Sequence, residues 1–391
     1  LKNATNDFSD DNLIGQGGSG RVYRGVLQDG LEVAIKKFRQ YALLDKHRFY
    51  DELILHSKLQ HEYIVELLGY GYGVIEREVE MGHKIVRALE CHAFFVAEYI
   101  PNGDMEKIID DGDVSWNSRF QLIKGIAEAM RYLHDEHRVV HMDLKPANIL
   151  LDSNMMPKIN DFGLARTFPK NVLVTSKDYT RNLLGTMGYM APEYLMDGLI
   201  SFKGDVYAFG VIILRTIGGM CTSEKPSRGA LEEWMTDMTW GLISSFFSTS
   251  QAWKLWKDEE KLFALFPFLD VPHLTQIKEC LKLGLLCIQD NRKKRPSMAD
   301  AVRVTHGSAG RASRFRAVLP NQNSVRLPAS SSKRTSPDCR ASSSCSSVEG
   351  SITGLQSSEL LQFQLSSKQA TGKTPLRRVK TQKVKRFMVP A

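Results

Sequence analysis

The sequence predicts an α+β fold in which a strand-rich region, residues 13–100, precedes a mainly helical region, residues 101–305. Three observations lead to this prediction. Short β-branched runs bounded by turn signals fill the first region, apolar residues at helical spacing fill the second, and residues 306–391 change to a serine-rich, basic composition. A chain of 391 residues exceeds one domain of about 100–200 residues, so we expect two lobes and additional material.

Composition excludes several classes of protein. The hydrophobic fraction of 42% is too high for a wholly disordered chain. The six cysteines lie far apart without a CxxC pair, which argues against a disulfide framework or a zinc site and favours a reducing, cytoplasmic compartment. No apolar run approaches the ~18–20 residues of a membrane span. Residues 307–391 hold 15 Lys and Arg against 3 Asp and Glu, so the net charge of +8 does not indicate a nucleic-acid-binding fold.

The strand-rich region contains three predicted elements. The β-branched run at residues 33–35 follows a turn signal at 28–30, which predicts a hairpin. Residues 45–60 place side chains at i, i+3, i+4 and i+7 on one face and predict a helix. Residues 93–100 predict another strand, because the Pro-Asn-Gly sequence at 101–103 ends it.

The helical region begins with a helix that carries apolar side chains along one face, at Phe120, Ile123, Ala127, Met130 and Leu133. Short strands are predicted near residues 139–160, and a long apolar segment covers residues 205–217. The last residues, 306–391, are rich in serine and poor in aromatic side chains. Such a composition does not offset the entropy of ordering the chain, so we expect a disordered tail.

A glycine-rich segment from Gly15 to Gly20 has the pattern GxGxxG. This pattern alone is a weak signal, and an ordinary turn is the simpler interpretation. It lies between strand candidates, whereas a dinucleotide fold requires a helix that begins at the last glycine. A glycine-rich hairpin would let backbone N–H groups approach phosphates that side chains would block.

Lys36 ends the apolar run of the second predicted strand. A lysine in such a strand must extend to solvent or find an anion, because an unpaired buried charge is costly. Glu52, on the face of the predicted helix, is one candidate partner. Taken alone, this pair would be read as two solvated side chains.

The segment from His141 to Asn148 is the strongest functional signal. It contains Asp143 and, five residues later, Asn148; an Asp161-Phe162-Gly163 sequence and an Ala191-Pro192-Glu193 sequence follow. Carboxylate and amide oxygens of this kind, together with substrate phosphates, are the ligands that Mg²⁺ prefers. Chance does not explain all these motifs in this order.

In this order the motifs resemble the signature set of protein kinases over residues 13–305. The segments 4–9, 143–151 and 185–190 are similar to those of plant receptor-like serine/threonine kinases. The resemblance implies a bilobal protein-kinase fold with a β-rich N-lobe, residues 13–100, that contains one regulatory helix. A mainly helical C-lobe would cover residues 101–305, an N-terminal flank residues 1–12, and the disordered tail residues 306–391.

The resemblance also implies the residues that bind ATP. Lys36 would hold the α- and β-phosphates and pair with Glu52, and adenine would lie against the backbone of Glu98 and Ile100. The remaining nucleotide-binding positions are small or apolar residues of the first strands, namely Ile14, Gly15, Gly17, Gly20, Val22 and Ala34.

The same resemblance assigns the chemistry to the later motifs. Asp143 would orient the substrate hydroxyl or accept its proton, and Lys145 would neutralise charge on the γ-phosphate. Asn148 and Asp161 would hold the metal ion, Mg²⁺ with Mn²⁺ as an alternative. Lys145, and Thr186 as a bridge between Asp143 and Lys145, favour Ser/Thr over Tyr as the acceptor.

Two further matches are structural: Glu193 with Arg295 as a buried ion pair, and Asp205 as a brace of the catalytic loop. Two positions depart from the pattern. Met142 replaces the usual Arg before Asp143, so we expect activity to depend weakly on phosphorylation of the activation loop. His56 replaces an apolar residue beside the regulatory helix, where it is either a satisfied core histidine or a loosened contact.

Residues 74–92 lengthen the connection before the third strand, and we expect a solvated loop, with a partner-docking insert as the alternative. The basic segment 377–386 is a candidate contact for acidic membrane lipid, with a nuclear signal or a solvated tail without a role as the alternatives. We therefore expect a cytoplasmic kinase, at the inner face of the plasma membrane in one arrangement, acting in a receptor-like pathway. Its partners would be ATP, protein substrates and an upstream receptor or co-receptor, without specific nucleic-acid binding. A pseudokinase scaffold and a small-molecule phosphotransferase remain alternatives.

Overall fold

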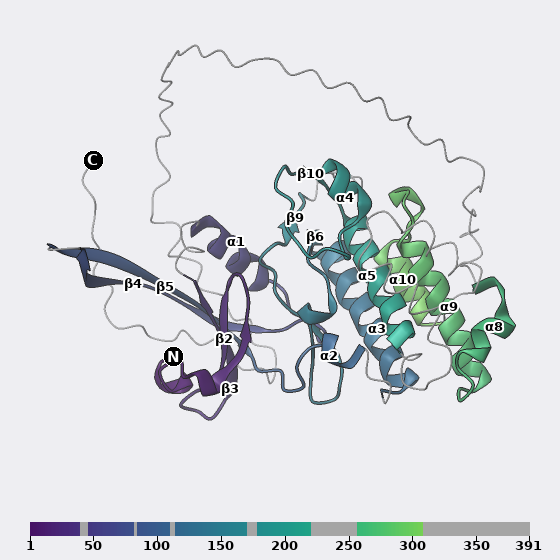
Figure 1. Ribbon diagram of the computed structural model, residues 1–391, viewed down its shortest axis with the longest axis horizontal. Coiled ribbons are helices and arrows are strands. Elements are labelled where there is room, and N and C mark those ends of the chain that lie inside the picture. The colour runs from purple at the N-terminus through teal and green to yellow at the C-terminus, as the bar shows by residue number, and fades with distance from the viewer. Residues whose placement is uncertain (40–45, 82–83, 110–113, 170–177, 220–255, 308–391) are drawn as a thin grey trace, which may run out of the picture. The chain divides into compact units, whose positions relative to one another are not determined.

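The computed structural model describes residues 1–391 except 40–45, 82–83, 110–113, 170–177, 220–255 and 308–391. In the described part a five-stranded sheet is followed by a mainly helical region (Figure 1). This confirms the predicted α+β, two-lobed fold. The expected disordered tail and its basic segment lie outside the described residues.

The N-terminal sheet is entirely antiparallel, with strand order β1-β2-β3-β5-β4. Residues in β3 alternate between the two faces of the sheet, as a strand requires. Val33 and Ile35 are fully buried on one face, and Ala34 and Lys36 point to the other. The strands are β1 Leu13–Gln16, β2 Gly20–Val26, β3 Glu32–Phe38, β4 Leu67–Met81 and β5 Lys84–Glu98.

The helix α1, Lys46–His56, packs on the face of the sheet that carries Lys36. Its Phe49 ring lies 5.4 Å from that of Phe38 and 5.0 Å from that of Phe95. Burial of these aromatic side chains is the main stabilising term for the contact, about 1.5–3 kcal/mol for each fully buried ring. The helix thereby holds Glu52, which is 8% exposed, next to the sheet.

The connection predicted as a solvated loop is instead part of a long β-hairpin. After a register shift between Leu67 and Gly69, strands β4 and β5 pair regularly from Gly69↔Val96 to Met81↔Lys84, so residues 74–92 are mainly strand. The pairing of β3 with β5 ends at Lys37↔Phe94, so the outer half of the hairpin is a two-stranded ribbon that extends beyond the sheet (Figure 1). The loop interpretation is wrong because backbone pairing, which composition does not report, continues through this segment.

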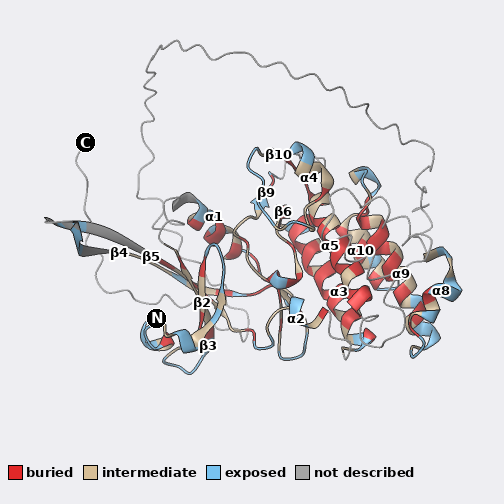
Figure 2. Cartoon of the chain, viewed as in Figure 1, coloured by how far each residue is buried: buried red, intermediate tan, exposed pale blue. Residues whose placement is uncertain are grey.

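The helical region surrounds α5, which lies among the other helices and is buried along most of its length (Figure 2). Close packing against α9 requires glycine: a Cβ on Gly210 would lie 2.5 Å from Cβ of Cys287. The helices are α2 Glu106–Ile109, α3 Trp116–Arg131 with a π-helical turn Tyr132–Glu136, α4 Pro192–Asp197, α5 Phe202–Gly218, α8 Glu259–Ala264, α9 Val271–Cys287 and α10 Met298–Thr305.

Side-chain caps define where several helices begin. Ser115 accepts a hydrogen bond from the backbone of Ser118 before α3, and Asp270 accepts one from His273 before α9. Ser297 and Asp300 form a reciprocal capping box at α10. Each cap satisfies backbone N–H groups that the first helical turn leaves without partners.

Short two-stranded pairs fix the loops between the helices. The pair β7–β8 flanks the short 3-10 turn Pro146–Asn148, and the pair β10–β11 ties residues 178–179 to the chain after α4. The strands are β6 Val139–Val140, β7 Ile149–Leu151, β8 Pro157–Ile159, β9 Arg166–Thr167, β10 Asp178–Tyr179 and β11 Leu199–Ile200, and further 3-10 turns cover Asn3–Thr5, Asp10–Asn12 and Arg292–Lys294.

A buried ion pair joins the loop before α10 to α4, as the sequence predicts. Arg295, with a fully buried side chain, donates two hydrogen bonds to Glu193, of 2.7 and 2.8 Å. It also donates to the carbonyl oxygens of Gln289 and Lys203. Burial of two charges is tolerated here because nearly all donors of the guanidinium are satisfied.

We predict that Glu193→Gln lowers the free energy of unfolding by about 3 kcal/mol, because it leaves the buried Arg295 without a counter-charge. Urea unfolding monitored by circular dichroism measures the change. The control is Glu259→Gln, which removes the exposed ion pair with Lys278 and should cost less than about 1 kcal/mol. Equal losses in the two variants would contradict the prediction.

Candidate functional site

The loop before Asp143 is anchored to α5 by a single carboxylate. Asp205, which is 2% exposed, accepts hydrogen bonds from the backbone N–H groups of His141, at 2.8 Å, and Met142, at 3.0 Å. The His134 ring donates to the same carboxylate at 2.8 Å. Met142 has a positive φ of 68°, a strained conformation for this residue that the two bonds hold in place. The predicted bracing by Asp205 is confirmed.

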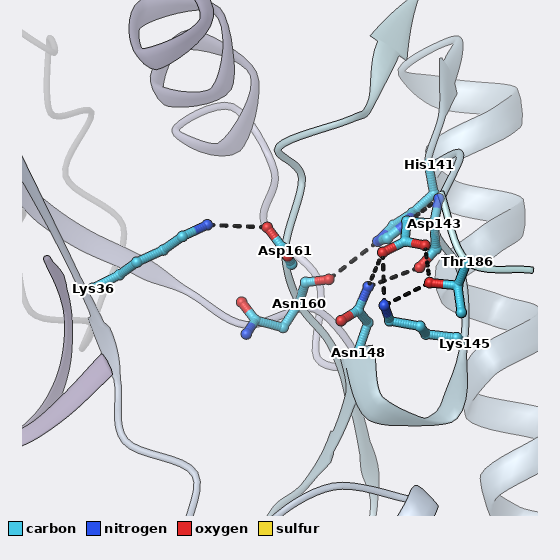
Figure 3. Close-up of polar contacts among 8 residues, drawn as sticks. All are labelled: Lys36, His141, Asp143, Lys145, Asn148, Asn160, Asp161 and Thr186. Atoms are coloured by element: carbon cyan, nitrogen blue, oxygen red, sulfur yellow. Dashed lines mark hydrogen bonds and ion pairs between the residues drawn. The ribbon is translucent and has the colours of Figure 1, made fainter. Parts of the chain in front are cut away.

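The buried His141 ring carries hydrogen bonds on both of its nitrogens. Its Nε2 lies 3.1 Å from the carbonyl oxygen of Asn160, and its Nδ1 lies 3.3 Å from the backbone nitrogen of Asp143. A carbonyl only accepts, so Nε2 carries the proton and Nδ1 accepts from Asp143. The ring therefore links the segment before Asp161 to the backbone of Asp143 (Figure 3).

Asp143 is surrounded by three polar side chains (Figure 3). Its Oδ1 accepts a hydrogen bond of 2.7 Å from Thr186, and its Oδ2 lies 3.0 Å from Nζ of Lys145 and 3.1 Å from Nδ2 of Asn148. Lys145 also donates to Thr186 at 2.7 Å. The predicted bridge of Thr186 between Asp143 and Lys145 is confirmed, so Asp143 is held by charge and hydrogen bonds together.

Asn148 and Asp161 offer oxygen atoms to a cation. Nδ2 of Asn148 donates to the carboxylate and the backbone carbonyl of Asp143, which orients the amide so that its oxygen is the free donor atom. The backbone carbonyl of Asn148 accepts from Asn160, which directly precedes Asp161. One carboxylate and one amide oxygen, with phosphate oxygens to complete the shell, fit Mg²⁺ chemistry.

Lys36 contacts two carboxylates, one more than the sequence predicts. Its Nζ lies 3.2 Å from Glu52 of α1. It also lies 3.0 Å from Asp161, a contact that Figure 3 shows. Burial lowers the pKa of Lys36, but the two carboxylates outweigh burial and raise it, so the ammonium stays charged. For Asp161, burial alone would raise the pKa, but the charge and the hydrogen bond of Lys36 outweigh burial, so the pKa of Asp161 is lowered. The three groups form one charged cluster.

The glycines of the first hairpin serve different purposes. A Cβ on Gly20 would lie 2.2 Å from the carbonyl oxygen of Lys37, so this glycine is required for packing between β2 and β3. A Cβ on Gly17 would meet nothing within 4 Å, and one on Gly15 would meet only Val22. Close approach of a ligand can therefore explain why residue 17 is glycine, whereas packing of β2 against β3 explains why residue 20 is glycine.

The segment after β5 presents backbone groups from Glu98 to Ile100. The N–H of Glu98 donates to the carbonyl of Glu66 at 3.0 Å, so it is not free for a ligand. The Glu98 side chain is also engaged, by Lys158 at 2.7 Å and by the backbone of Glu66. A contact with adenine at Glu98 would have to use its carbonyl, and the side chain of Ile100 is buried beside it.

His56 is a satisfied core histidine. Its Nε2 lies 2.8 Å from the carbonyl oxygen of Val65, and its ring lies 4.9 Å from that of Phe162. Burial lowers the pKa of His56, with a smaller contribution from the charge of Lys36, so the ring is neutral and Nε2 donates to Val65. Glu52 stays paired with Lys36 one helical turn away.

Met142 contacts an apolar cluster where an arginine would offer charge. Its side chain packs against a cluster formed by the buried residues Val140, Phe168, Tyr194, Ile200 and Phe202. A methionine fills such a cluster without a hydrogen-bond donor. An anion on the activation loop therefore finds no partner in residue 142.

Sequence reasoning missed several residues that support the site. His141 and Asn160 connect the segments that carry Asp143 and Asp161, Lys158 holds Glu98, and residues 1–12 pack on the sheet. For His141 the sequence offers one signal, namely its position between the β-branched pair Val139-Val140 and Asp143. The others are contacts between residues distant in sequence, which periodicity and spacing do not report.

Comparison with protein families matches residues 8–306 to the protein kinase domain. The chain belongs to the protein kinase family. Among curated proteins the kinase is 38% identical to cysteine-rich receptor-like protein kinase 26 of Arabidopsis thaliana, over 78% of this chain and 43% of that protein. It is 37% identical to cysteine-rich receptor-like protein kinase 44, over 79% of this chain and 76% of that protein.

Receptor-like serine/threonine-protein kinase SD1-7 of Arabidopsis thaliana is 36% identical over 79% of this chain and 34% of that protein. The kinase thus spans less than half of two of these three relatives and about three quarters of the third. Membership of the protein kinase family implies ATP as a substrate, a divalent metal ion and protein acceptors.

We predict that His56 makes stability depend on pH. The unfolded ring has an ordinary pKa of about 6.5, and burial lowers the folded value, so the unfolded state binds more protons between the two values. The free energy of unfolding should therefore fall as the pH drops below about 6.5. Urea unfolding at a series of pH values measures the slope.

The control for this prediction is His56→Leu, which keeps an apolar contact with Phe162 and removes the titration. Burial also lowers the pKa of His61, so the unmodified protein and the variant share that part of the slope, and their difference isolates His56. Identical slopes in the two proteins would show that His56 does not titrate differently in the folded state.

Proposed function

We propose that this chain is a protein serine/threonine kinase that transfers the γ-phosphoryl group of ATP to Ser and Thr hydroxyls of proteins. The observation that carries the proposal is the set of contacts around Asp143, whose carboxylate is within 2.7–3.1 Å of Thr186, Lys145 and Asn148. These bonds fix a carboxylate in one orientation beside a lysine, as transfer to a hydroxyl requires.

In the proposed reaction the acceptor hydroxyl oxygen attacks the γ-phosphorus, and the bond to the β–γ bridging oxygen breaks to release ADP. Asp143 orients the hydroxyl and accepts its proton, and Lys145 neutralises negative charge on the transferred group. Because the transition state is loose, the main contribution of both residues is positioning and charge stabilisation. Glu52 acts indirectly, by holding Lys36 at 3.2 Å.

The nucleotide would lie on the sheet face that carries Lys36. Lys36, charged and already near Asp161, is suited to the α- and β-phosphates. The carbonyl of Glu98 and the backbone of Ile100 would meet adenine. The apolar and glycine residues around it would be Ile14, Gly15, Gly17, Gly20, Val22 and Ala34, of which Ile14 is about half exposed and Gly17 leaves open space.

Asn148 and Asp161 would hold the metal ion, for which Mg²⁺ is our choice and Mn²⁺ the alternative. A bound metal ion supplies charge neutralisation of the phosphate oxygens. The chain contributes by orienting its donor atoms: Asp143 fixes the amide of Asn148, and Lys36 keeps Asp161 ionised. The contact between Lys145 and Thr186 supports Ser and Thr as acceptors, because the lysine lies where the acceptor would bind.

We further propose that the kinase acts in the cytoplasm in a receptor-like signalling pathway, downstream of a receptor or co-receptor. The names of the similar proteins support this context. The described residues contain no helix long and apolar enough to cross a bilayer. The basic segment 377–386, outside the described residues, would provide contact with acidic lipid at the inner face of the plasma membrane.

We predict that the full chain phosphorylates Ser or Thr residues of a generic basic protein in the presence of ATP and Mg²⁺. Asp143→Asn should lower the rate at least about 100-fold, because the amide cannot accept the hydroxyl proton. Incorporation of radiolabel and phosphoamino-acid analysis measure rate and acceptor. The matched control, Asp135→Asn, changes an exposed carboxylate and should leave the rate unchanged.

A chain that binds ATP and Mg²⁺ without transferring phosphate, in both the unmodified protein and the control, would contradict the catalytic proposal. Phosphate found on Tyr alone would contradict the acceptor class. Equal rates for Asp143→Asn and the unmodified protein would contradict the role of Asp143.

We also predict that activity depends weakly on phosphorylation of the activation loop, because Met142 offers a phosphate no hydrogen-bond donor. The dephosphorylated enzyme should keep about half or more of its initial rate. The measurement compares phosphatase-treated enzyme with the variants Tyr179→Phe and Thr180→Ala; Thr175 and Ser176, the other candidate positions, lie outside the described residues. A loss of more than about tenfold would contradict the prediction.

A further inference from the structure

Residues 1–12 form a compact segment, here called the strap, that packs on the N-terminal sheet. Thr5 is its fully buried centre. The Thr5 hydroxyl donates to the carbonyl of Leu1 at 3.0 Å and accepts from the backbone N–H of Phe8 at 3.0 Å. Asn12 closes the strap by donating to the carbonyl of Thr5 at 3.0 Å. The strap is thus an ordered part of the N-lobe.

The strap covers one face of strands β2 and β3. The register pairs Arg21 with Lys37, Tyr23 with Ile35 and Gly25 with Val33, so these six residues share that face. The Phe8 ring lies 5.3 Å from the ring of Tyr23 and 5.4 Å from that of Phe94 on β5. The ammonium of Lys37 lies 4.5 Å from the centre of the same ring.

The proposed ATP site occupies the opposite face of the same strands. Val22 of β2 pairs with Lys36 of β3, and Ala34 precedes Lys36 by two residues, so all three share one face. The residues proposed to contact ATP therefore alternate along each strand with those that contact the strap. A displacement of β2 or β3 from the strap side therefore moves the ATP side by the same amount. The two faces are mechanically coupled because one thin sheet separates them.

The strap also holds the end of the glycine-rich segment. Asp10 accepts a hydrogen bond of 2.5 Å from Arg21, the residue that directly follows Gly20. Near the other end of β2, a Cβ on Gly25 would lie 3.1 Å from the carbonyl oxygen of Ala4, so the backbones of the strap and the strand are in close contact there. The Arg21–Asp10 pair is exposed and contributes little alone, whereas the close backbone approach at Gly25 is a tight contact; the strap therefore touches β2 near both of its ends.

The docked strap has a strained backbone. Asn6, Asp7 and Phe8 have φ values of 49°, 54° and 59°, a region that asparagine and aspartate tolerate and that is unfavourable for phenylalanine. Packing of Leu1, Ala4 and Phe8 against the buried face of the sheet keeps the strap in place. Docking is therefore a balance between strain and packing, which a small change can shift.

We propose that the strap is a positioning element for ATP: docked, it holds β2, β3 and the glycine-rich segment in the arrangement that binds the nucleotide, and released, it weakens nucleotide binding. The proposal rests on the proposed function only in placing ATP on the Lys36 face. Phe8 and Asp10 are the positioning residues, because Phe8 contacts β2 and β3, Asp10 contacts β2, and both lie on the side of the sheet away from Lys36.

The test uses the full chain and the variants Phe8→Ala and Asp10→Asn. Titration calorimetry with Mg·ADP gives the nucleotide Kd, and initial rates give KM for ATP and kcat. If release leaves the competent arrangement about one fifth populated, Phe8→Ala raises Kd and KM about fivefold. Asp10→Asn should raise both about twofold, and kcat should stay within about twofold for both variants, because saturating ATP restores the docked state.

Two controls separate positioning from a general loss of stability. Met298→Ala truncates a buried residue of α10 and should lower the melting temperature while leaving the nucleotide Kd unchanged. Asn6→Gly relieves strain at an exposed position of the strap and should leave Kd unchanged or lower it.

Higher Kd values in the two strap variants, with an unchanged value in Met298→Ala, would support the proposal. An unchanged Kd in Phe8→Ala, or an equal rise in Met298→Ala, would overturn it. If Phe8→Ala does not fold, Asp10→Asn alone decides, because it keeps the size of the side chain. The Kd is measured without turnover, so a chain that fails to transfer phosphate still gives a separate answer for the strap.

Discussion

The buried carboxylate of Asp205 is the constraint on which the loop that carries Asp143 depends. Two backbone N–H groups and the His134 ring donate to it, so its charge is compensated by three hydrogen bonds in the core of the helical region. It belongs to α5, the central and most buried helix, which gives the loop a rigid support. With the backbone at Met142 held at a positive φ, the next residue, Asp143, faces Lys145 and Thr186.

A second charged cluster connects the sheet to this loop. Lys36 on β3 and Glu52 on α1 are largely buried and need a partner of opposite charge, because an unpaired buried charge is costly. Asp161, between β8 and β9, is more exposed and adds a second carboxylate to Lys36. Asn160 extends the connection to His141, and so to the backbone of Asp143. The proposed phosphate-binding, metal-binding and acceptor residues are thus linked by polar contacts in one network, which favours one arrangement of the site.

The sheet contributes two faces with separate duties. One face carries Lys36, packs against α1 and is the proposed nucleotide side. The other buries Val33, Ile35 and Val96 beneath the strap. Because successive side chains of a strand point to opposite faces, each residue that faces the strap is next in sequence to a residue that faces the proposed nucleotide site. This arrangement explains why a segment outside the first strands bears on a site it does not touch.

Much of the site could be predicted from the sequence because its chemistry depends on short spacings. Asp143, Lys145 and Asn148 lie within six residues, so the adjacent turn brings them close to one another. Asp205 and Thr186, which are distant in sequence, then hold this loop in place. Thr186 and the pair Glu193 with Arg295 were also predictable, but only through the resemblance to a family. The α+β division followed from the change in periodicity between the two regions.

Contacts between distant segments depend on how the chain packs and could not be predicted from spacing. Lys36 meets Asp161 across 125 positions, and no periodicity reports such a partner. The segment 74–92 is paired strand, because β4 and β5 keep their antiparallel register from Gly69↔Val96 to Met81↔Lys84. His56 is satisfied because the carbonyl of Val65 lies opposite its ring, and residues 1–12 are ordered because an apolar sheet face lies beneath them. The amino-acid sequence sets which chemical groups a side chain offers and, through its periodicity, which face of a helix or strand the side chain occupies. The partner that lies opposite that side chain is set by the fold, because packing brings distant segments together.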